Sequence, residues 1–121
     1  MPILTIEIVT RPGERFSLNL AAELADRSGE IFASPPGNTW VKVQFIPPEH
    51  YAENRSEEEV FPVFVSILKA QLPPADDLQG EAAQLTNAIA QLCNRPPQNV
   101  HVHYLSPGAG RVAFGGKLLP D

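Results

Sequence analysis

The chain has 121 residues, 43% of them hydrophobic, and fourteen acidic against nine basic residues leave a net charge of −5. This size predicts one compact domain, and the acidic balance argues against a nucleic-acid partner because phosphate binding needs a basic patch. No stretch approaches the roughly 18 apolar residues of a membrane span and no secretory signal opens the chain, so we expect a cytoplasmic protein with no membrane partner.

The first third of the chain reads as a strand, a helix and a second strand. Branched apolar residues predict a strand over residues 3–9, and from Leu20 onward apolar residues recur on one helical face. That face carries Leu20, Leu24, Ile31 and Phe32. The segment 40–46 is predicted as the second strand. Alternation in this strand turns three apolar side chains toward the helices: Val41, Val43 and Phe45.

The remainder of the chain repeats this order after a polar connector. The connector, residues 47–60, contains the triplet Glu57-Glu58-Glu59, which we expect to be solvated. Strands are then predicted over 63–68 and 100–105, on either side of a helix. The apolar stripe of that helix consists of Leu78, Ala82, Leu85, Ile89 and Leu92. Cys93 ends the stripe and is expected in the core, because free cysteines are usually buried.

The two halves are related by a fixed spacing of 61 residues. Three markers show it: Pro12, Pro35 and Asn38 return as Pro73, Pro96 and Asn99. We therefore predict two βαβ pseudo-repeats, 2–46 and 63–105, within a single domain over residues 1–121. Right-handed crossovers place both helices on one face of a four-stranded mixed sheet, which is an α+β fold. The other face is expected to be too apolar for water, so oligomerisation would cover it.

The segment 108–117 is rich in glycine and carries Val112 and Phe114 between the glycines. This pattern predicts a tight hairpin whose apolar side chains pack against a neighbouring subunit.

Three features together resemble the tautomerase superfamily over nearly the whole chain. They are Pro2 at the start of a βαβ unit, the 61-residue duplication, and the ending Gly110-Arg-Val-Ala-Phe-Gly-Gly-Lys117. Half-length members of that superfamily are one βαβ unit with a similar ending, and duplicated members are homotrimers. The resemblance implies that this chain is a duplicated, homotrimeric member that needs no cofactor.

The resemblance also implies a catalytic role for Pro2. In the superfamily the amino-terminal proline is a general base that moves a proton between carbon and oxygen of an enol or keto acid. Met1 must first be removed, because a peptide bond would block the proline nitrogen. Burial and nearby cations disfavour an ammonium ion and so lower the pKa of the amine toward neutrality, where a base works best. Val63 occupies the same place in the second repeat, so we expect one catalytic amine per subunit.

His101 and His103 share one face of the predicted strand 100–105. By the resemblance, His101 falls where half-length members place a substrate-polarising arginine, and His103 falls at a pocket asparagine of a duplicated member. Both can donate hydrogen bonds to a carboxylate or to a developing enolate oxygen. The alternative is that they only satisfy polar groups at a subunit interface. Two histidines without a third ligand are a weak metal signal, so we expect no metal.

A keto acid also needs a cation for its carboxylate, and four basic residues lie near predicted strand ends or hairpins: Arg11, Lys42, Lys69 and Arg111. Arg11 lies one position from a substrate-binding arginine of the half-length members, and Lys42 repeats His103 at the 61-residue spacing. Val112 falls at a pocket phenylalanine of the family, and either Val112 or Phe114 would form an apolar wall. The predicted substrate-binding residues are therefore His101, His103, Arg11, Lys42, Val112 and Phe114.

The predicted function is keto–enol proton transfer by a tautomerase or isomerase on a small 2-oxo or 2-hydroxy unsaturated acid. Ser34 stands where a duplicated member has a lysine, and residues 69–74 lack the paired arginines of the dehalogenase and decarboxylase branches. Two alternatives stay open: a non-catalytic trimeric interaction module, and a Pro2-dependent hydratase or dehalogenase in which Glu7, Glu49 or Tyr104 would activate water.

Overall fold

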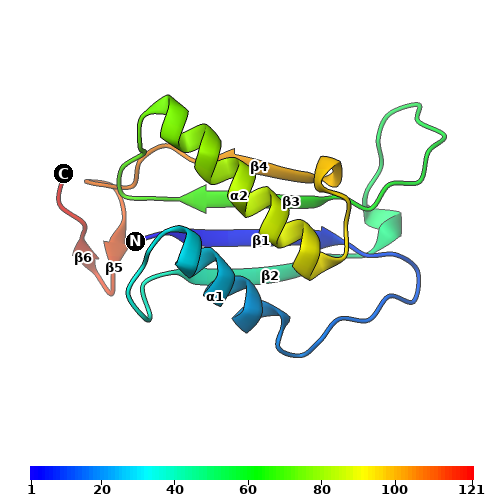
Figure 1. Ribbon diagram of the computed structural model, residues 1–121, viewed down its shortest axis with the longest axis horizontal. Helices are drawn as coiled ribbons and strands as arrows, with labels where there is room; N and C mark the ends of the chain where they lie inside the picture. Colours follow the sequence, from blue (N-terminus) through cyan, green and yellow to red (C-terminus); the bar gives the residue numbers. More distant parts are fainter.

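The computed structural model describes residues 1–121 and arranges them as one four-stranded sheet with both long helices on a single face (Figure 1). The strands are β1 (Ile3–Val9), β2 (Trp40–Ile46), β3 (Val63–Leu68) and β4 (Val100–Tyr104), and the helices are α1 (Leu20–Ile31) and α2 (Ala75–Cys93). The strand order is β2-β1-β3-β4. Strand β1 pairs with β2 in parallel, β3 with β4 in parallel, and β1 with β3 antiparallel. The predicted mixed α+β sheet is confirmed.

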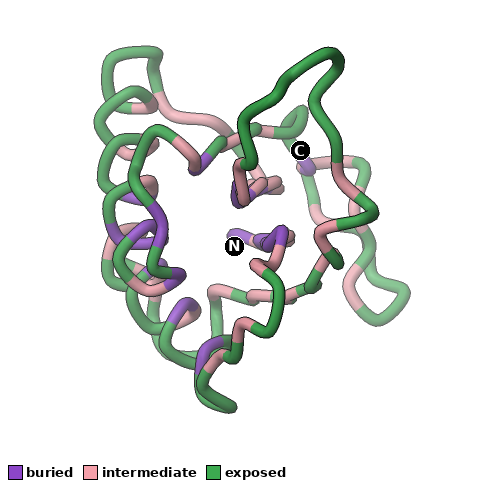
Figure 2. The backbone as a smooth tube through the Cα atoms, turned by 90° about the vertical axis from the view of Figure 1, so that its right-hand side faces the viewer, coloured by how far each residue is buried: buried purple, intermediate pink, exposed green.

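The core lies between the sheet and the helices, because alternate strand residues point toward α1 and α2. In β1, Leu4, Ile6 and Ile8 are fully buried, whereas the residues between them are half-buried on the opposite face. Leu24 and Leu85 meet these side chains from the two helices. Figure 2 shows the buried residues on the helix surfaces that face the sheet and along the central strands.

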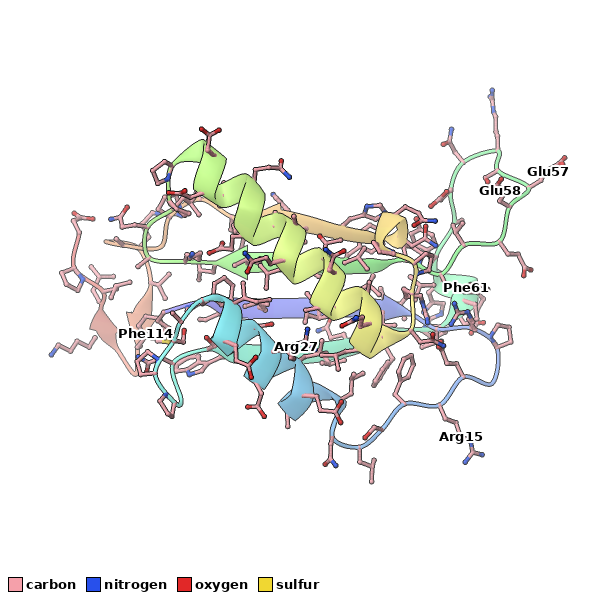
Figure 3. All side chains as sticks on the ribbon, viewed as in Figure 1. Arg15, Arg27, Glu57, Glu58, Phe61 and Phe114 are labelled. Atoms are coloured by element: carbon pink, nitrogen blue, oxygen red, sulfur yellow. The ribbon has the colours of Figure 1, made fainter.

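The connector between the halves contains only one 3-10 turn, η1 (Pro48–His50). A second such turn, η2 (Pro97–Asn99), leads into β4. Glu57, Glu58 and Glu59 are exposed, as expected for a solvated triplet, and Figure 3 shows Glu57 and Glu58 at the tip of the connector loop. No helix is long and apolar enough to cross a membrane.

The face of the sheet away from the helices has a polar centre, which corrects the expectation of an apolar surface. Its central positions carry Thr5, Lys42, Gln44, Ser66 and His103. Apolar side chains on this face stand toward the strand ends, as Trp40 and Leu68 do. The prediction overlooked Thr5 and Glu7 in β1 and Ser66 in β3, which alternate with the core residues.

The carboxy-terminal hairpin forms, but its paired strands lie slightly later than predicted. They are β5 (Ala113–Phe114) and β6 (Lys117–Leu118), joined by Gly115 and Gly116. Both glycines have positive φ angles, 58° and 87°, as a two-residue type I′ turn requires. Phe114 packs edge-on against Trp40 of the same chain, with ring centroids 5.5 Å apart. Phe114 thus packs within its own chain, and its packing on a neighbouring subunit stays a prediction.

Two smaller differences concern strand ends. Strand β4 ends at Tyr104, one residue earlier than predicted, although the Leu105 N–H still donates to the Ile67 carbonyl at 2.9 Å. Phe45 stacks on Phe16 with ring centroids 5.0 Å apart, but it is 51% exposed. It lies near the end of β2, beside the start of α1, so no helix covers it fully.

Candidate active site

Pro2 is buried directly before β1, at one end of the sheet. Its carbonyl accepts a hydrogen bond of 3.0 Å from the Trp40 N–H, which begins the pairing of β1 with β2. Because β1 lies between β2 and β3, both neighbouring strands hold its first residues in place. Pro2 therefore occupies a fixed position and not a frayed terminus.

A cavity of about 210 Å³ lies at Pro2. It is lined by Met1, Pro2, Phe32, Ala33, Ser34, Pro35, Asn38 and Lys69. The segment between α1 and β2 supplies most of this wall, and Lys69 follows β3. Antiparallel pairing of β1 with β3 places Ile3 opposite Leu68. Pro2, which precedes β1, and Lys69, which follows β3, therefore lie at the same end of the sheet. Lys69 is the only charged side chain in the lining.

Lys69 is held at both its backbone and its side chain. The Lys69 carbonyl accepts a hydrogen bond of 2.8 Å from the Gly108 N–H. Its Nζ lies 2.8 Å from Glu81 Oε1 and 4.9 Å from the centroid of the Phe32 ring. An ammonium has three donors, so this ion pair leaves donors for an anionic ligand in the cavity.

The predicted histidines do not line this cavity in the same protomer. His101 pairs with Phe64 and His103 with Ser66, whereas the Pro2 end of the sheet is marked by Lys69. At about 3.3 Å per residue, His103 stands roughly 10 Å and His101 roughly 16 Å along the sheet from that end. Both side chains are exposed on the edge strand β4. They are free to meet a second molecule.

The predicted cations Arg11 and Lys42 also lie away from Pro2. Arg11 follows β1 at the opposite end of the sheet, where its Nη1 pairs with Glu14 at 3.1 Å. Lys42 is exposed on β2, opposite Thr5. Neither cation lines the Pro2 cavity.

Of the two predicted wall residues, Phe114 comes nearer to Pro2. Phe114 contacts the Trp40 ring, and the Trp40 backbone holds the Pro2 carbonyl. Figure 3 shows Phe114 at the end of the sheet where the chain begins. Val112 packs instead over Gly108, whose N–H binds the Lys69 carbonyl.

The sequence interpretation missed the pocket roles of Phe32, Ser34 and Asn38, and it considered Lys69 without placing it in the site. One signal could have found the three loop residues. The proline pair after the first helix leads into a strand parallel to β1, so that loop must pass beside Pro2. The position of Lys69 beside Pro2 depends on the antiparallel pairing of β1 with β3, and the sequence repeat alone does not specify that pairing.

In the second repeat a large buried side chain, Arg95, takes the position of Ser34. Arg95 stands 61 residues after Ser34, and its side chain is fully buried. The guanidinium donates to the carbonyls of Val9 and Phe61 at 2.8 and 2.6 Å and to both oxygens of Glu14 at 2.7 Å each. Burial would raise the pKa of Glu14, but the hydrogen bonds from Arg95 and from the Arg11 N–H outweigh it and lower that pKa.

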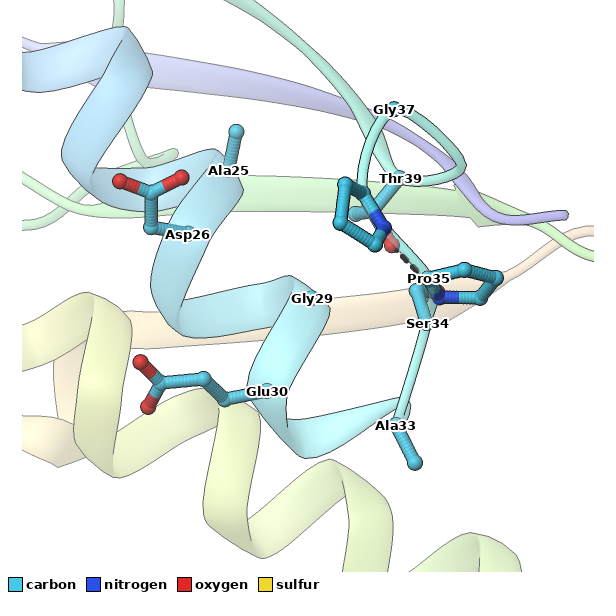
Figure 4. A pocket seen from close by; sticks show the side chains of 10 residues that line it. Ala25, Asp26, Gly29, Glu30, Ala33, Ser34, Pro35, Gly37 and Thr39 are labelled. Atoms are coloured by element: carbon cyan, nitrogen blue, oxygen red, sulfur yellow. Dashed lines mark hydrogen bonds between the residues drawn. The ribbon is translucent and has the colours of Figure 1, made fainter.

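Two of the larger cavities lack the chemistry of the Pro2 site. One, of about 430 Å³, adjoins it along α1, and its charged side chains, Asp26 and Glu30, are both acidic (Figure 4). There the Thr39 hydroxyl donates to Ser34 Oγ at 2.7 Å. The other, of about 520 Å³, is mostly apolar and includes Phe16 and Phe45 at the far end of β2. No group of three His, Cys, Asp or Glu side chains could hold a metal ion.

No family model and no curated protein matches this sequence. Its fold does match solved structures, among them the macrophage migration inhibitory factor of Trichinella spiralis, with a TM-score of 0.74. That match covers 96% of this chain and 98% of the other at 12% identity. This chain has the tautomerase-superfamily fold.

Two further tautomerase-fold structures match equally well. Pt0534, solved after inactivation by 2-oxo-3-pentynoate, is 16% identical with a TM-score of 0.75, and the match covers 96% of this chain and 94% of Pt0534. A fused 4-OT, solved as a symmetric trimer, is 12% identical with a TM-score of 0.75 and the same coverage of both chains. The resemblance seen in the sequence is thus confirmed for the fold.

Proposed function

We propose that this chain is a keto–enol tautomerase in which the secondary amine of Pro2, freed by removal of Met1, is the general base. The substrate would be a small 2-oxo or 2-hydroxy unsaturated acid. The observation that carries this proposal is the shared cavity of Pro2 and Lys69, which puts a potential amine base and a carboxylate-binding cation together.

The two residues divide the reaction between them. Lys69 binds the substrate carboxylate and so orients the reacting carbon toward the Pro2 nitrogen. The amine removes a proton from the carbon beside the keto group, and the protonated amine or a water molecule then gives a proton to the carbonyl oxygen, which yields the enol. In the reverse direction the protonated amine returns the proton to carbon. The positive charge of Lys69 and the burial of Pro2 both favour the neutral amine, which is the form that accepts a proton.

A homotrimer is part of this proposal. Within one protomer the Pro2 cavity offers Lys69 as a cation but no histidine, and the strand carrying His101 and His103 is an exposed edge. In a trimer, His101 and His103 from a neighbour could reach the cavity and polarise the substrate oxygen. The symmetric trimer of the fused 4-OT supports this arrangement.

Tautomerisation is favoured over hydration because it needs only the Pro2 amine and a carboxylate-binding cation, and the lining of one protomer supplies both. A hydratase also needs a group that activates water, and one protomer contributes no carboxylate, tyrosine or histidine side chain to the lining. The non-catalytic alternative differs in one chemical respect only: if Met1 stays, the Pro2 nitrogen is an amide and cannot act as a base.

The proposal is tested with 2-oxo-3-pentynoate, the compound that inactivates Pt0534. We expect one covalent adduct per chain, located on Pro2 by mass spectrometry of the amino-terminal peptide, with parallel loss of turnover. The control is the same chain with an uncleavable amino-terminal extension, in which the Pro2 nitrogen is blocked and no adduct should form. Turnover that survives in the blocked chain would contradict the proposal.

A further inference from the structure

Glu81 joins three separate elements behind the Pro2 cavity. Its Oε1 lies 2.8 Å from Lys69 Nζ, and its Oε2 accepts a hydrogen bond of 2.7 Å from the Tyr104 hydroxyl. Lys69 follows β3, Glu81 lies on α2 and Tyr104 ends β4. The side chains of Lys69 and Glu81 are only 17% and 14% exposed, so the pair is shielded from much of the solvent.

Tyr104 holds the Glu81 carboxylate in place through its hydroxyl group. Burial, together with the hydrogen bond and negative charge of Glu81, raises the pKa of the Tyr104 hydroxyl. The hydroxyl therefore stays protonated and keeps donating to Glu81. With both carboxylate oxygens bound, Glu81 is restricted to one orientation.

A lysine with no partner would sample many rotamers and would lose that freedom on binding a ligand. Here the ammonium is already held between Glu81 and the Phe32 ring. We propose that Glu81, anchored by Tyr104, is a positioning residue that holds the Lys69 ammonium in the Pro2 cavity ready for a substrate carboxylate. This inference rests on the proposed function, since it assumes that Lys69 binds that carboxylate.

Two variants test the inference while keeping the charges of Lys69 and residue 81. Glu81→Asp is one methylene too short to reach both partners, and Tyr104→Phe removes only the anchoring hydroxyl. Their kinetics would be measured with phenylenolpyruvate and with its methyl ester, which has no carboxylate. Both variants should raise KM for the acid about three- to tenfold, the range expected for one lost hydrogen bond, with kcat nearly unchanged. KM for the ester should not change.

Asp77→Asn is the matched control, because Asp77 is an exposed carboxylate one turn earlier on α2. It should leave both substrates unaffected. If Glu81→Asp and Tyr104→Phe impair the acid and the ester equally, their role is only structural and the inference is overturned.

Cinnamate binding, measured by calorimetry, separates this inference from the proposed function because it needs no turnover. We expect wild type to bind cinnamate, Lys69→Ala to lose binding, and Glu81→Asp and Tyr104→Phe to weaken it. If Lys69→Ala loses binding while the other two variants bind like wild type, the positioning role is overturned and the carboxylate site stands. If Lys69→Ala binds like wild type, both ideas fail.

Discussion

The guanidinium of Arg95 binds both carboxylate oxygens of Glu14 at 2.7 Å and is completely shielded from solvent. Arg95 occupies the place in the second repeat that Ser34 occupies in the first. Ser34 lines the cavity beside Pro2, whereas the larger Arg95 reaches inward and binds the carbonyls of Val9 and Phe61. The two repeats therefore differ in chemistry at this position.

Arg95→Ala should lower the free energy of unfolding by about 3–5 kcal/mol, because it leaves Glu14 with only its contacts to Arg11 and removes the buried donor to four carbonyls. Urea unfolding followed by circular dichroism measures this change. Arg11→Ala is the matched control. Arg11 also pairs with Glu14, but its side chain is 38% exposed, so its removal should cost about 1 kcal/mol or less. Equal losses in the two variants would show that burial of the pair is unimportant.

The contribution of Glu14 to stability should disappear in acid. Its pKa in the folded chain lies below the ordinary 4.5, so the folded state favours the ionised carboxylate. That stabilisation is complete above the unfolded pKa and is lost as the pH falls through the lower folded value. We expect wild type to exceed Glu14→Gln in unfolding free energy at about pH 6 and the difference to shrink by about pH 3. A difference independent of pH would contradict this assignment.

Cys93 should react with thiol reagents only when the chain unfolds. Burial raises the pKa of its thiol to about 11, so very little thiolate is present at pH 8, and the side chain is fully enclosed. Labelling with 5,5′-dithiobis(2-nitrobenzoate) at pH 8 should be slow in buffer and fast in concentrated urea. Rapid labelling of the native protein would place Cys93 outside the core.

Gly108→Ala should disturb the carboxy-terminal segment. A Cβ atom at Gly108 would lie 2.9 Å from Val112 Cγ2 and 3.2 Å from Leu68 Cδ1, so we expect a loss of about 1–3 kcal/mol in unfolding free energy. Because Phe114 packs on Trp40, the emission of Trp40 should change as well. In the control Gly80→Ala, a Cβ atom on α2 meets nothing within 4 Å. That variant should be neutral or stabilised by up to about 1 kcal/mol.

The strands of this fold were predictable because their branched and apolar residues form short runs separated by polar, proline-containing segments. The predicted bounds of β1, β2 and β3 agree with the structure, and Cys93 is buried as expected. The hairpin was placed less well. Its strands are only two residues long, so the positive φ angles of Gly115 and Gly116 decide where the turn falls, and the hydrophobic pattern does not.

The site was less predictable than the fold. Pro2 was predicted as a site residue from its position in the chain, but its neighbours depend on contacts between segments far apart in the sequence. Lys69 reaches Pro2 only through the antiparallel pairing of β1 with β3, and Glu81 reaches Lys69 only through the packing of α2. Strand alternation alone placed His101 and His103 on the correct face, yet it gave no indication of their distance from Pro2.

The central claim, that the Pro2 amine is the catalytic base, is tested most directly by turnover of phenylenolpyruvate. Intact mass would first establish that Met1 is absent, and loss of the enol absorbance would then be followed for wild type and Pro2→Ala. A positioned general base accelerates a reaction roughly 10²- to 10⁴-fold. We therefore expect Pro2→Ala to lower the turnover rate by a factor within about that range. Equal rates for the two proteins would contradict the proline mechanism.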